Sequence, residues 1–471
     1  MLSNFIEAKI LENLAFRPTS GQREMIGELG SFIASEDPAE IMMIKGYAGT
    51  GKTTLVSSLV RTLESLEKKS VLLAPTGRAA KVLGAYTGSP AWTIHKKIYR
   101  QKSGKDGAGE FVLDRNLYTR TTFIVDEASM IGDRSADSVF GSGDLLRDLL
   151  TYIESGQDCR LILVGDTAQL PPVGLDVSPA LDRLRLESYG YRIREIEMTE
   201  VVRQSAGSGI LHNATSIRSL ITAGREEVPE LRLKGFGDIS IVSGEELLET
   251  ISGSYDRYGV GETIVVTRSN KRANRFNAGI RSRILWREEQ VSSGDLLMVV
   301  KNNYYWKDEE NRLDFIANGD IIRVEKVLHQ EEAHGHRFAN LRATLPDFGD
   351  LELEARVLLD VIDLEGPSLD YPAQKALYLS VAEDYPDVKG KRGLTGKITT
   401  DPYYNALQVK FAYAVTCHKS QGGQWRSVFL DQGYFTDEML TLDYLRWLYT
   451  AFTRATDHLY LVNPPRQFIP R

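Results

Sequence analysis

A glycine-rich stretch near the N-terminus, residues 46–53, has the spacing Gly-x-x-x-x-Gly-Lys-Thr of a phosphate-binding loop. The glycines allow backbone N–H groups to curl around phosphate oxygens, as they do in a Walker A loop. Lys52 would carry a positive charge to the β- and γ-phosphates, and the hydroxyl of Thr53 would bind Mg²⁺. The sequence therefore predicts a nucleotide site with contacts from Gly46, Tyr47, Ala48, Gly49, Thr50, Gly51, Lys52, Thr53 and Thr54.

Two neighbouring acidic residues, Asp126 and Glu127, extend this prediction from binding to hydrolysis. Asp126 would hold Mg²⁺, and Glu127 would orient and polarise the attacking water. Gln169 lies in the loop after a further apolar run, where its amide could sense the γ-phosphate through a hydrogen bond. We therefore expect ATP and Mg²⁺ as cofactors, with Lys52, Glu127 and Gln169 in the catalytic set.

Four short apolar runs precede polar or glycine-rich loops: residues 41–44, 71–74, 123–125 and 161–164. Each run is continuous rather than alternating, which is the pattern of a parallel strand buried on both faces. Ligands in open α/β sheets bind at the carboxyl ends of the strands. The runs therefore predict one α/β domain that brings the phosphate loop, the acidic pair and Gln169 together.

Three later runs, residues 263–266, 412–415 and 458–462, predict a second α/β domain. The segment between them has a different sequence pattern. Polar and apolar residues alternate with period two at residues 351–357, and turn residues are dense around them. This pattern is typical of antiparallel strands with one exposed face, and it predicts a small inserted β-barrel. The domain boundaries that we expect are 1–195, 196–290, 291–405 and 406–471.

The composition excludes several classes of protein. The chain has 471 residues, of which 42% are hydrophobic and 26% charged, close to ordinary globular usage. No run of 18 apolar residues is present, so we expect no membrane span, and the N-terminus lacks the apolar core of a signal peptide. Two distant cysteines exclude a disulfide framework and favour a reducing, cytoplasmic compartment.

The net charge of −7 does not suggest a broadly basic surface for binding nucleic acid, but one segment of the chain is strongly basic. Residues 77–105 contain seven basic side chains and no acidic one. A local basic groove is sufficient for nucleic-acid binding, whatever the net charge. The alternative is an ordinary solvated face.

The chain resembles superfamily-1 helicases, specifically the 1B branch of RecD-, Dda- and Pif-type DNA helicases. The resemblance covers nearly the whole chain and keeps the order of the family's motifs. The blocks that carry it are residues 16–22 (the Q motif, with Gln22), 46–53, 74–81, 91–96 (with Thr-Ile-His), 126–127, 165–174, 199–205, 416–422 and 448–455. It implies two RecA-like P-loop lobes with parallel sheets, an inserted SH3-like barrel and a pin hairpin in the first lobe.

The resemblance also implies roles for individual residues. Gln22 would bind the adenine edge, and Arg203 and Arg454 would be arginine fingers on the γ-phosphate. In this family an aromatic residue often precedes the arginine of the block at residues 199–205, called motif IV. Here that position is Val202, so adenine stacking must come from elsewhere or be weak. The implied DNA contacts are Thr76, Arg78, Thr93, His95, Phe111, Thr267, Asn270, Thr416, His418 and Gln421, with a core position as the alternative for His418.

The segment from about 99 to 122 is expected to form the pin hairpin, with a polar tip at residues 103–109. An apolar wedge could replace the stacking that is lost when a base pair opens. We therefore expect Phe111 or a close neighbour to contact the DNA fork. The alternative is that Phe111 packs against the first lobe.

The resemblance implies an ATP-dependent DNA helicase that moves 5′→3′ on single-stranded DNA and opens duplexes. We expect a monomeric motor that acts on single strands and forks in repair, replication or recombination. A single-strand-binding protein or another replication or repair protein is the expected partner. The alternatives are an ATP-switched nucleic-acid-binding protein, a translocase that does not unwind, and an RNA helicase.

Overall fold

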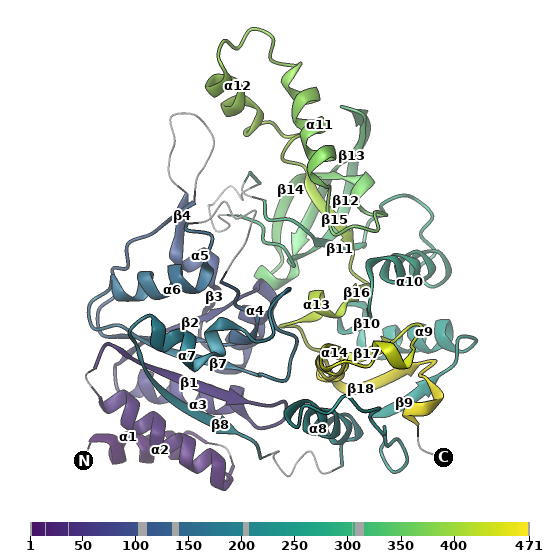
Figure 1. Ribbon diagram of the computed structural model, residues 1–471. Coiled ribbons are helices and arrows are strands. Elements are labelled where there is room, and N and C mark those ends of the chain that lie inside the picture. Colours follow the sequence, from purple (N-terminus) through teal and green to yellow (C-terminus); the bar gives the residue numbers. More distant parts are fainter. Residues whose placement is uncertain are drawn as a thin grey trace.

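The computed structural model describes residues 2–14, 16–35, 37–101, 111–133, 141–200, 207–303, 305–306 and 315–469. Two α/β lobes lie side by side, and a β-barrel with a helical extension stands above them (Figure 1). This arrangement confirms the predicted α/β class with two parallel sheets and an inserted barrel. In the described part of the chain, no helix is long and apolar enough to cross a membrane.

The first lobe is built on a parallel sheet with the strand order β3-β2-β6-β7-β1-β8. Its strands are β1 (Glu40–Gly46), β2 (Lys69–Ala74), β3 (Ala91–Thr93), β6 (Thr121–Val125), β7 (Arg160–Gly165) and β8 (Arg192–Met198). All four apolar runs predicted as strands are found here. β8 runs on to Met198, past the expected boundary at residue 195.

Both faces of this sheet are covered, which explains the continuous apolar runs. Alternate residues of β1 pack on opposite sides, Met42 with one cluster of buried side chains and Met43 with another. The first cluster includes side chains from α1 (Leu2–Glu12), α2 (Ser20–Ala34), α3 (Lys52–Ser65) and α4 (Gly77–Thr87), and the second from α5 (Ile94–Ile98), α6 (Leu145–Glu154) and α7 (Arg183–Ser188).

The second lobe has a parallel sheet with the order β16-β10-β17-β18-β9. Its strands are β9 (Ile239–Val242), β10 (Thr263–Thr267), β16 (Ala414–Thr416), β17 (Trp425–Asp431) and β18 (Ala455–Val462). The helices of this part of the chain are α8 (Gly209–Thr222), α9 (Leu247–Tyr258), α10 (Asn270–Arg283), α13 (Cys417–Ser420) and α14 (Leu442–Phe452). The three predicted strands are present, and β9 and β17 complete the sheet.

The inserted barrel is closed by five strands, β11 (Leu296–Val299), β12 (Ile321–Ala333), β13 (His336–Leu345), β14 (Leu351–Leu358) and β15 (Leu407–Phe411). The alternation at residues 351–357 belongs to β14, which pairs antiparallel with β13 as predicted. β15 closes the barrel against β11 and β14, although it lies beyond the expected end of the insertion at residue 405.

A helical extension of the barrel, α11 (Tyr371–Ala382) and α12 (Lys391–Ile398), was not predicted. Aspartate and proline, which stand at positions 370 and 372, are common in turns as well as at helix starts. In the structure, the side chain of Asp370 accepts a hydrogen bond from Ala373 N and caps the helix, with a proline in its first turn.

The predicted hairpin in the first lobe has its base in β4 (Tyr99–Gln101) and β5 (Phe111–Leu113), which pair antiparallel. Its expected tip at residues 103–109 lies outside the described residues. The hairpin prediction is therefore confirmed for its two strands.

Candidate functional site

The phosphate loop joins β1 to α3 and is already folded into a cradle. Gly49 and Gly51 have φ values of 77° and 86°, a conformation that disfavours side chains. Nζ of Lys52 lies 2.9 Å from the carbonyl oxygen of Tyr47, and Oγ1 of Thr50 donates to the same carbonyl at 2.8 Å. A Cβ atom at Gly46 would lie 2.9 Å from the Lys52 side chain, so glycine is needed there.

Gln22 is hydrogen-bonded to the backbone of the phosphate loop. It is 1% exposed, and its Nε2 donates to the carbonyl of Thr50 at 2.9 Å. Its Oε1 accepts from the backbone of Thr19, which closes a capping box at the start of α2. Both ends of the amide are bound to the protein here, and the adenine contact of Gln22 stays a prediction.

The acidic pair follows the carboxyl end of β6, as predicted. Oδ1 of Asp126 accepts from the backbone N of Glu127 at 2.9 Å. Burial, and after it the neighbouring carboxylate of Glu127, raises the pKa of Asp126 to about 6, against the opposing charge of Lys52. Glu127 has a φ of 53°, a backbone strain that is concentrated at functional sites in proteins.

These residues fit a magnesium ion that is shared with a nucleotide. Mg²⁺ is usually held by one or two carboxylates and by substrate phosphates rather than by a full protein cage. Within the described ranges, no group of three or more His, Cys, Asp or Glu side chains could hold a metal by itself. Asp126 and Thr53 offer a carboxylate and a hydroxyl, and a cation would favour the ionised form of this buried carboxyl.

Gln169 lies four residues beyond the end of β7 and is 6% exposed. Its Oε1 is buried, and among the residues that the structure describes it has no hydrogen-bond partner. A buried amide oxygen without a partner is costly, so its place in the fold calls for an explanation. A water or a nucleotide group at this point would supply the missing donor.

The two lobes meet on the loop that carries Gln169. The hydroxyl of Tyr449, on α14 of the second lobe, donates to Oδ2 of Asp166 at 2.7 Å and accepts from the backbone N of Ala48 at 2.9 Å. Oγ1 of Thr450 accepts from Leu170 N at 2.9 Å. We did not single out Tyr449 or Thr450 from the sequence, although both lie inside the block at residues 448–455.

Of the two expected arginine fingers, the structure describes Arg454 alone. Arg203 and Val202 lie outside the described residues. Arg454 is 3% exposed, and its guanidinium donates to the carbonyls of Thr450 and Gly423 and to Oγ1 of Thr453, all within the second lobe. The role of both arginines stays a prediction.

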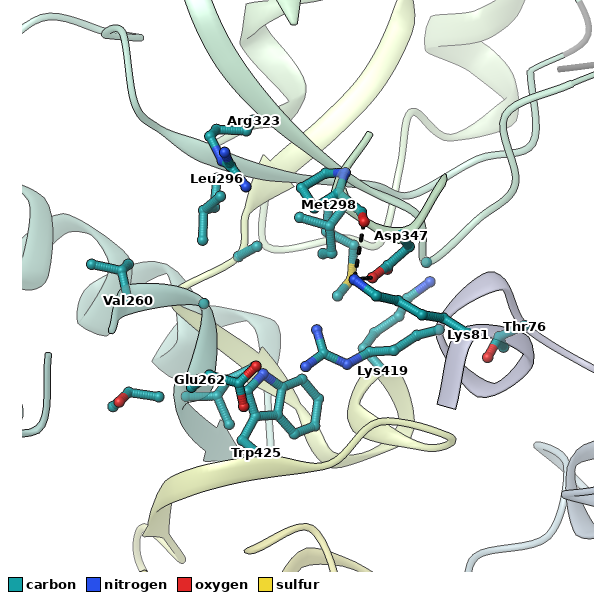
Figure 2. Close-up of a pocket in the computed structure, with 18 of the residues that line it drawn as sticks. Thr76, Lys81, Val260, Glu262, Leu296, Met298, Arg323, Asp347, Lys419 and Trp425 are labelled. Carbon is teal, nitrogen blue, oxygen red and sulfur yellow. Dashed lines mark hydrogen bonds and ion pairs between the residues drawn. The ribbon is translucent and has the colours of Figure 1, made fainter. Parts of the chain in front are cut away.

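A cavity of about 240 Å³ lies where the two lobes and the barrel meet (Figure 2). The first lobe contributes residues of α4, the second lobe residues of α13 and β17, and the barrel residues of β11 and β12. Its lining includes four cationic side chains and two carboxylates, from Arg78, Lys81, Arg323, Lys419, Glu262 and Asp347.

Two cationic side chains of the first lobe that line this cavity contact the second lobe and the barrel. The guanidinium of Arg78 lies 4.0 Å from the centre of the Trp425 ring and donates to the carbonyl of Gln424 at 3.1 Å. Nζ of Lys81 lies 3.1 Å from Oδ1 of Asp347 and donates to the carbonyl of Pro346 at 3.0 Å, as the dashed lines in Figure 2 show. Cations of the first lobe therefore bind the second lobe and the barrel.

A second cavity, of about 200 Å³, is lined by Trp92, Thr93 and Lys96 and shares Lys81 and Asp347 with the first. The two cavities together reach from the block at residues 416–422 in the second lobe to the Thr-Ile-His element in the first. The predicted DNA residues Thr76, Arg78 and Gln421 line the first cavity, and Thr93 lines the second.

Several of these predicted DNA residues also have structural roles. The hydroxyls of Thr76 and Thr93 cap α4 and α5, and Nε2 of Gln421 donates to the carbonyl of Leu170 at 2.6 Å. Burial lowers the pKa of His95 to about 4, so its ring is neutral at physiological pH. Thr76 and Thr93 therefore fix the starts of their helices, and Gln421 links the second lobe to the loop after β7.

The remaining predicted DNA residues divide into exposed and buried ones. His418 is exposed, which rules out the alternative of a core histidine. Thr416 precedes α13, and Asn270 is the first residue of α10. Thr267 is fully buried, and its hydroxyl donates to backbone carbonyls, so the expectation of a DNA contact there is wrong.

The expected contact of Phe111 or a close neighbour with a DNA fork stays a prediction, and the structure buries Phe111 itself. Its side chain is 4% exposed and belongs to the same buried cluster as Phe123. The ring packs edge-to-face on Phe315, with 6.3 Å between centroids. This packing is that of the alternative, in which Phe111 lies against the first lobe, and it also includes Phe315 of the insertion.

Two family models match the chain, an "AAA domain" over residues 19–230 and a "UvrD-like helicase C-terminal domain" over residues 411–462. The ATP-dependent RecD2 DNA helicase of Deinococcus radiodurans is 32% identical over 197 residues, which are 42% of this chain and 24% of that protein. The ATP-dependent DNA helicase dda of Enterobacteria phage T4 is 28% identical over 290 residues, which are 60% of this chain and 62% of that one. The chain thus matches about a quarter of the length of the first of these relatives.

A solved structure described as two coordinating Pif1 helicases on forked double-stranded DNA aligns with 97% of this chain and 95% of that one. The sequence identity of this pair is 15% and the TM-score is 0.49.

Proposed function

We propose that this chain, which belongs to the superfamily-1B group of RecD-, Dda- and Pif-like proteins, is an ATP-driven DNA helicase that moves 5′→3′ along single strands. The observation that carries the proposal is the position of Gln169. The loop that carries Gln169 follows β7, and the phosphate loop follows β1 of the same sheet. The second lobe binds the Gln169 loop directly through Thr450 and Gln421. A change at the γ-phosphate can therefore reach the lobe interface.

Hydrolysis would use the residues at the carboxyl ends of β1, β6 and β7. Lys52 and the loop amides would bind the phosphates, and Thr53 and Asp126 would hold Mg²⁺, which neutralises charge on the phosphate oxygens. Glu127 would orient the attacking water and take its proton. Gln169 would donate from its amide to the γ-phosphate and accept with its unpaired Oε1 from the water.

We propose Arg203 and Arg454 as the cations that the second lobe supplies when the cleft closes. Such arginines stabilise the charge that develops on the transferred phosphoryl group. Arg454 would have to exchange its three hydrogen bonds within the second lobe for phosphate oxygens. Because of this exchange, Arg454 would contribute to hydrolysis only when the two lobes are closed around the nucleotide.

The DNA track that we propose is the pair of cavities beneath the barrel. Single-strand binding requires cations along the phosphate backbone, and Arg78, Lys81, Lys96 and Lys419 lie there from both lobes. Lys81 is now paired with the carboxylate of Asp347, which a DNA phosphate would replace. Opening and closing of the lobes around ATP would shift the grip of these residues along the strand and separate a duplex ahead.

We propose that the motor works as a monomer on single strands and forks. Its functional units would follow the expected bounds of 1–195, with the hairpin at about 99–122, 196–290, 291–405 and 406–471, with two changes. β8 extends the first lobe to Met198, and β15 adds Leu407–Phe411 to the barrel. A single-strand-binding protein or another replication or repair protein is the partner that we propose.

Single-strand affinity should fall steeply with salt, despite the net charge of −7. Each phosphate neutralised contributes about −0.7 to the slope of log K against log salt. Lys81→Ala should therefore flatten the slope by about 0.7, measured by fluorescence anisotropy of a labelled oligonucleotide. Lys68 is an exposed lysine just before β2, away from both cavities, and Lys68→Ala should leave the slope unchanged.

A salt-independent affinity in the unsubstituted protein would remove residues 77–105 from the DNA path. Equal slopes for Lys81→Ala and the unsubstituted protein would place the track outside the two cavities.

A further inference from the structure

Tyr449 connects the second lobe to two loops of the first lobe through one hydroxyl group. It lies on α14 and is 1% exposed. Its oxygen accepts from the backbone N of Ala48 in the phosphate loop at 2.9 Å. The same hydroxyl donates to Oδ2 of Asp166 at 2.7 Å, directly after β7.

The phenol uses both kinds of hydrogen bond that it can make. A tyrosine hydroxyl offers one donor and an acceptor oxygen, and here each is bound to a first-lobe group. Burial, and after it the carboxylate of Asp166, raises the pKa of Tyr449 well above its usual value, so the proton stays on the phenol. Asp166 is itself 1% exposed, and its other oxygen accepts from Ala168 N at 3.0 Å.

The loop after Asp166 is bound to the second lobe at two further points. Leu170 N donates to Oγ1 of Thr450, the residue next to Tyr449, and the carbonyl of Leu170 accepts from Nε2 of Gln421. Gln169 lies between Asp166 and these contacts. The path of its backbone is therefore set from both sides by side chains of the second lobe.

We propose that Tyr449 is a positioning residue for ATP hydrolysis, which holds the phosphate loop and the Gln169 loop in register with the second lobe. This inference rests on the proposed function. Tyr449 touches neither nucleotide nor water in this account. It acts through Ala48 and Asp166, and makes the alignment of Gln169 depend on contact between the lobes.

Tyr449→Phe removes the hydroxyl and keeps the ring that fills the core. Misplacement of a catalytic group by about 1 Å can cost 10²-fold in rate. We expect kcat in the presence of single-stranded DNA to fall by about 10- to 100-fold. KM for ATP and the affinity for a non-hydrolysable ATP analogue should stay within about twofold, because Lys52 and the loop amides other than that of Ala48 keep their surroundings.

Tyr444→Phe is the matched control. Tyr444 lies on the same helix and is 4% exposed, but its hydroxyl donates to Oε1 of Gln432, within the second lobe, at 3.0 Å. Both variants lose a phenol oxygen from a buried tyrosine of α14, but only that of Tyr449 contacts the first lobe. Only Tyr449→Phe should lower kcat.

Asp166→Asn tests the same link from the other side. It should lower kcat by a similar factor, and the double variant should be no slower than the slower single variant, because both changes break one linkage. If Tyr449→Phe does not fold, as judged by thermal unfolding, full kcat in Asp166→Asn would overturn the inference.

If the unsubstituted protein hydrolyses ATP and Tyr449→Phe has the same kcat as Tyr444→Phe, the inference is overturned while the proposed function stands. A loss in analogue affinity that matches the loss in kcat would also overturn the inference, because Tyr449 would then act in nucleotide binding. Absence of ATP hydrolysis in the unsubstituted protein would instead contradict the proposed function.

Discussion

Lys52→Ala is expected to abolish ATP hydrolysis, with a fall in kcat of at least about 10²–10³-fold, the range for removing one preorganised electrostatic group. Lys52 begins α3, and its Nζ lies over the phosphate loop, 2.9 Å from the carbonyl of Tyr47. It supplies the cation that would meet the β- and γ-phosphates. Steady-state phosphate release with single-stranded DNA present measures the effect.

Lys45→Ala is a suitable control for this experiment. Lys45 lies just before the loop on β1, but its ammonium group is paired with Glu195 at 2.7 Å. This variant should keep most of its hydrolysis. Substantial hydrolysis in Lys52→Ala would mean that the nucleotide binds elsewhere in the chain.

Glu127→Gln is expected to retain nucleotide and DNA binding and to lose turnover, by about 10²–10⁴-fold. The amide has nearly the shape of the carboxylate but cannot take the proton from water. Single-turnover hydrolysis and binding of a fluorescent ATP analogue separate the two effects.

The control must account for the unusual backbone of Glu127, whose φ is 53°. Glu67 is an exposed glutamate with a φ of 54°, in the turn after α3, and Glu67→Gln should hydrolyse ATP normally. Normal steady-state hydrolysis in Glu127→Gln would show that another group acts as the base.

The parallel sheets could be predicted because burial on both faces leaves a continuous apolar signature, as in residues 41–44 of β1. The inserted barrel was recognised from β14, where polar and apolar residues alternate. The helical extension was missed because Asp370 and the proline after Tyr371 suit a turn and a helix start equally well. Such a choice is decided by packing that local sequence does not contain.

The loop residues of the site could be predicted because their roles depend on neighbours close in sequence. The phosphate loop and the Asp126–Glu127 pair are of this kind. Contacts between distant segments could not be predicted in this way. Examples are the hydrogen bond between Ala48 N and the Tyr449 hydroxyl, and the ion pair of Lys81 with Asp347. Phe111 shows the same limit, because its partner Phe315 comes from the barrel insertion.

The most direct test of the proposed motor combines ATP hydrolysis with strand separation on tailed duplexes. The unsubstituted protein is incubated with ATP and Mg²⁺, with and without single-stranded DNA, and then with duplexes that carry a 5′ or a 3′ single-stranded tail. We predict that single-stranded DNA stimulates hydrolysis and that the 5′-tailed duplex is opened while the 3′-tailed one is not. Hydrolysis that is indifferent to DNA, or opening of the 3′-tailed duplex alone, would contradict the account.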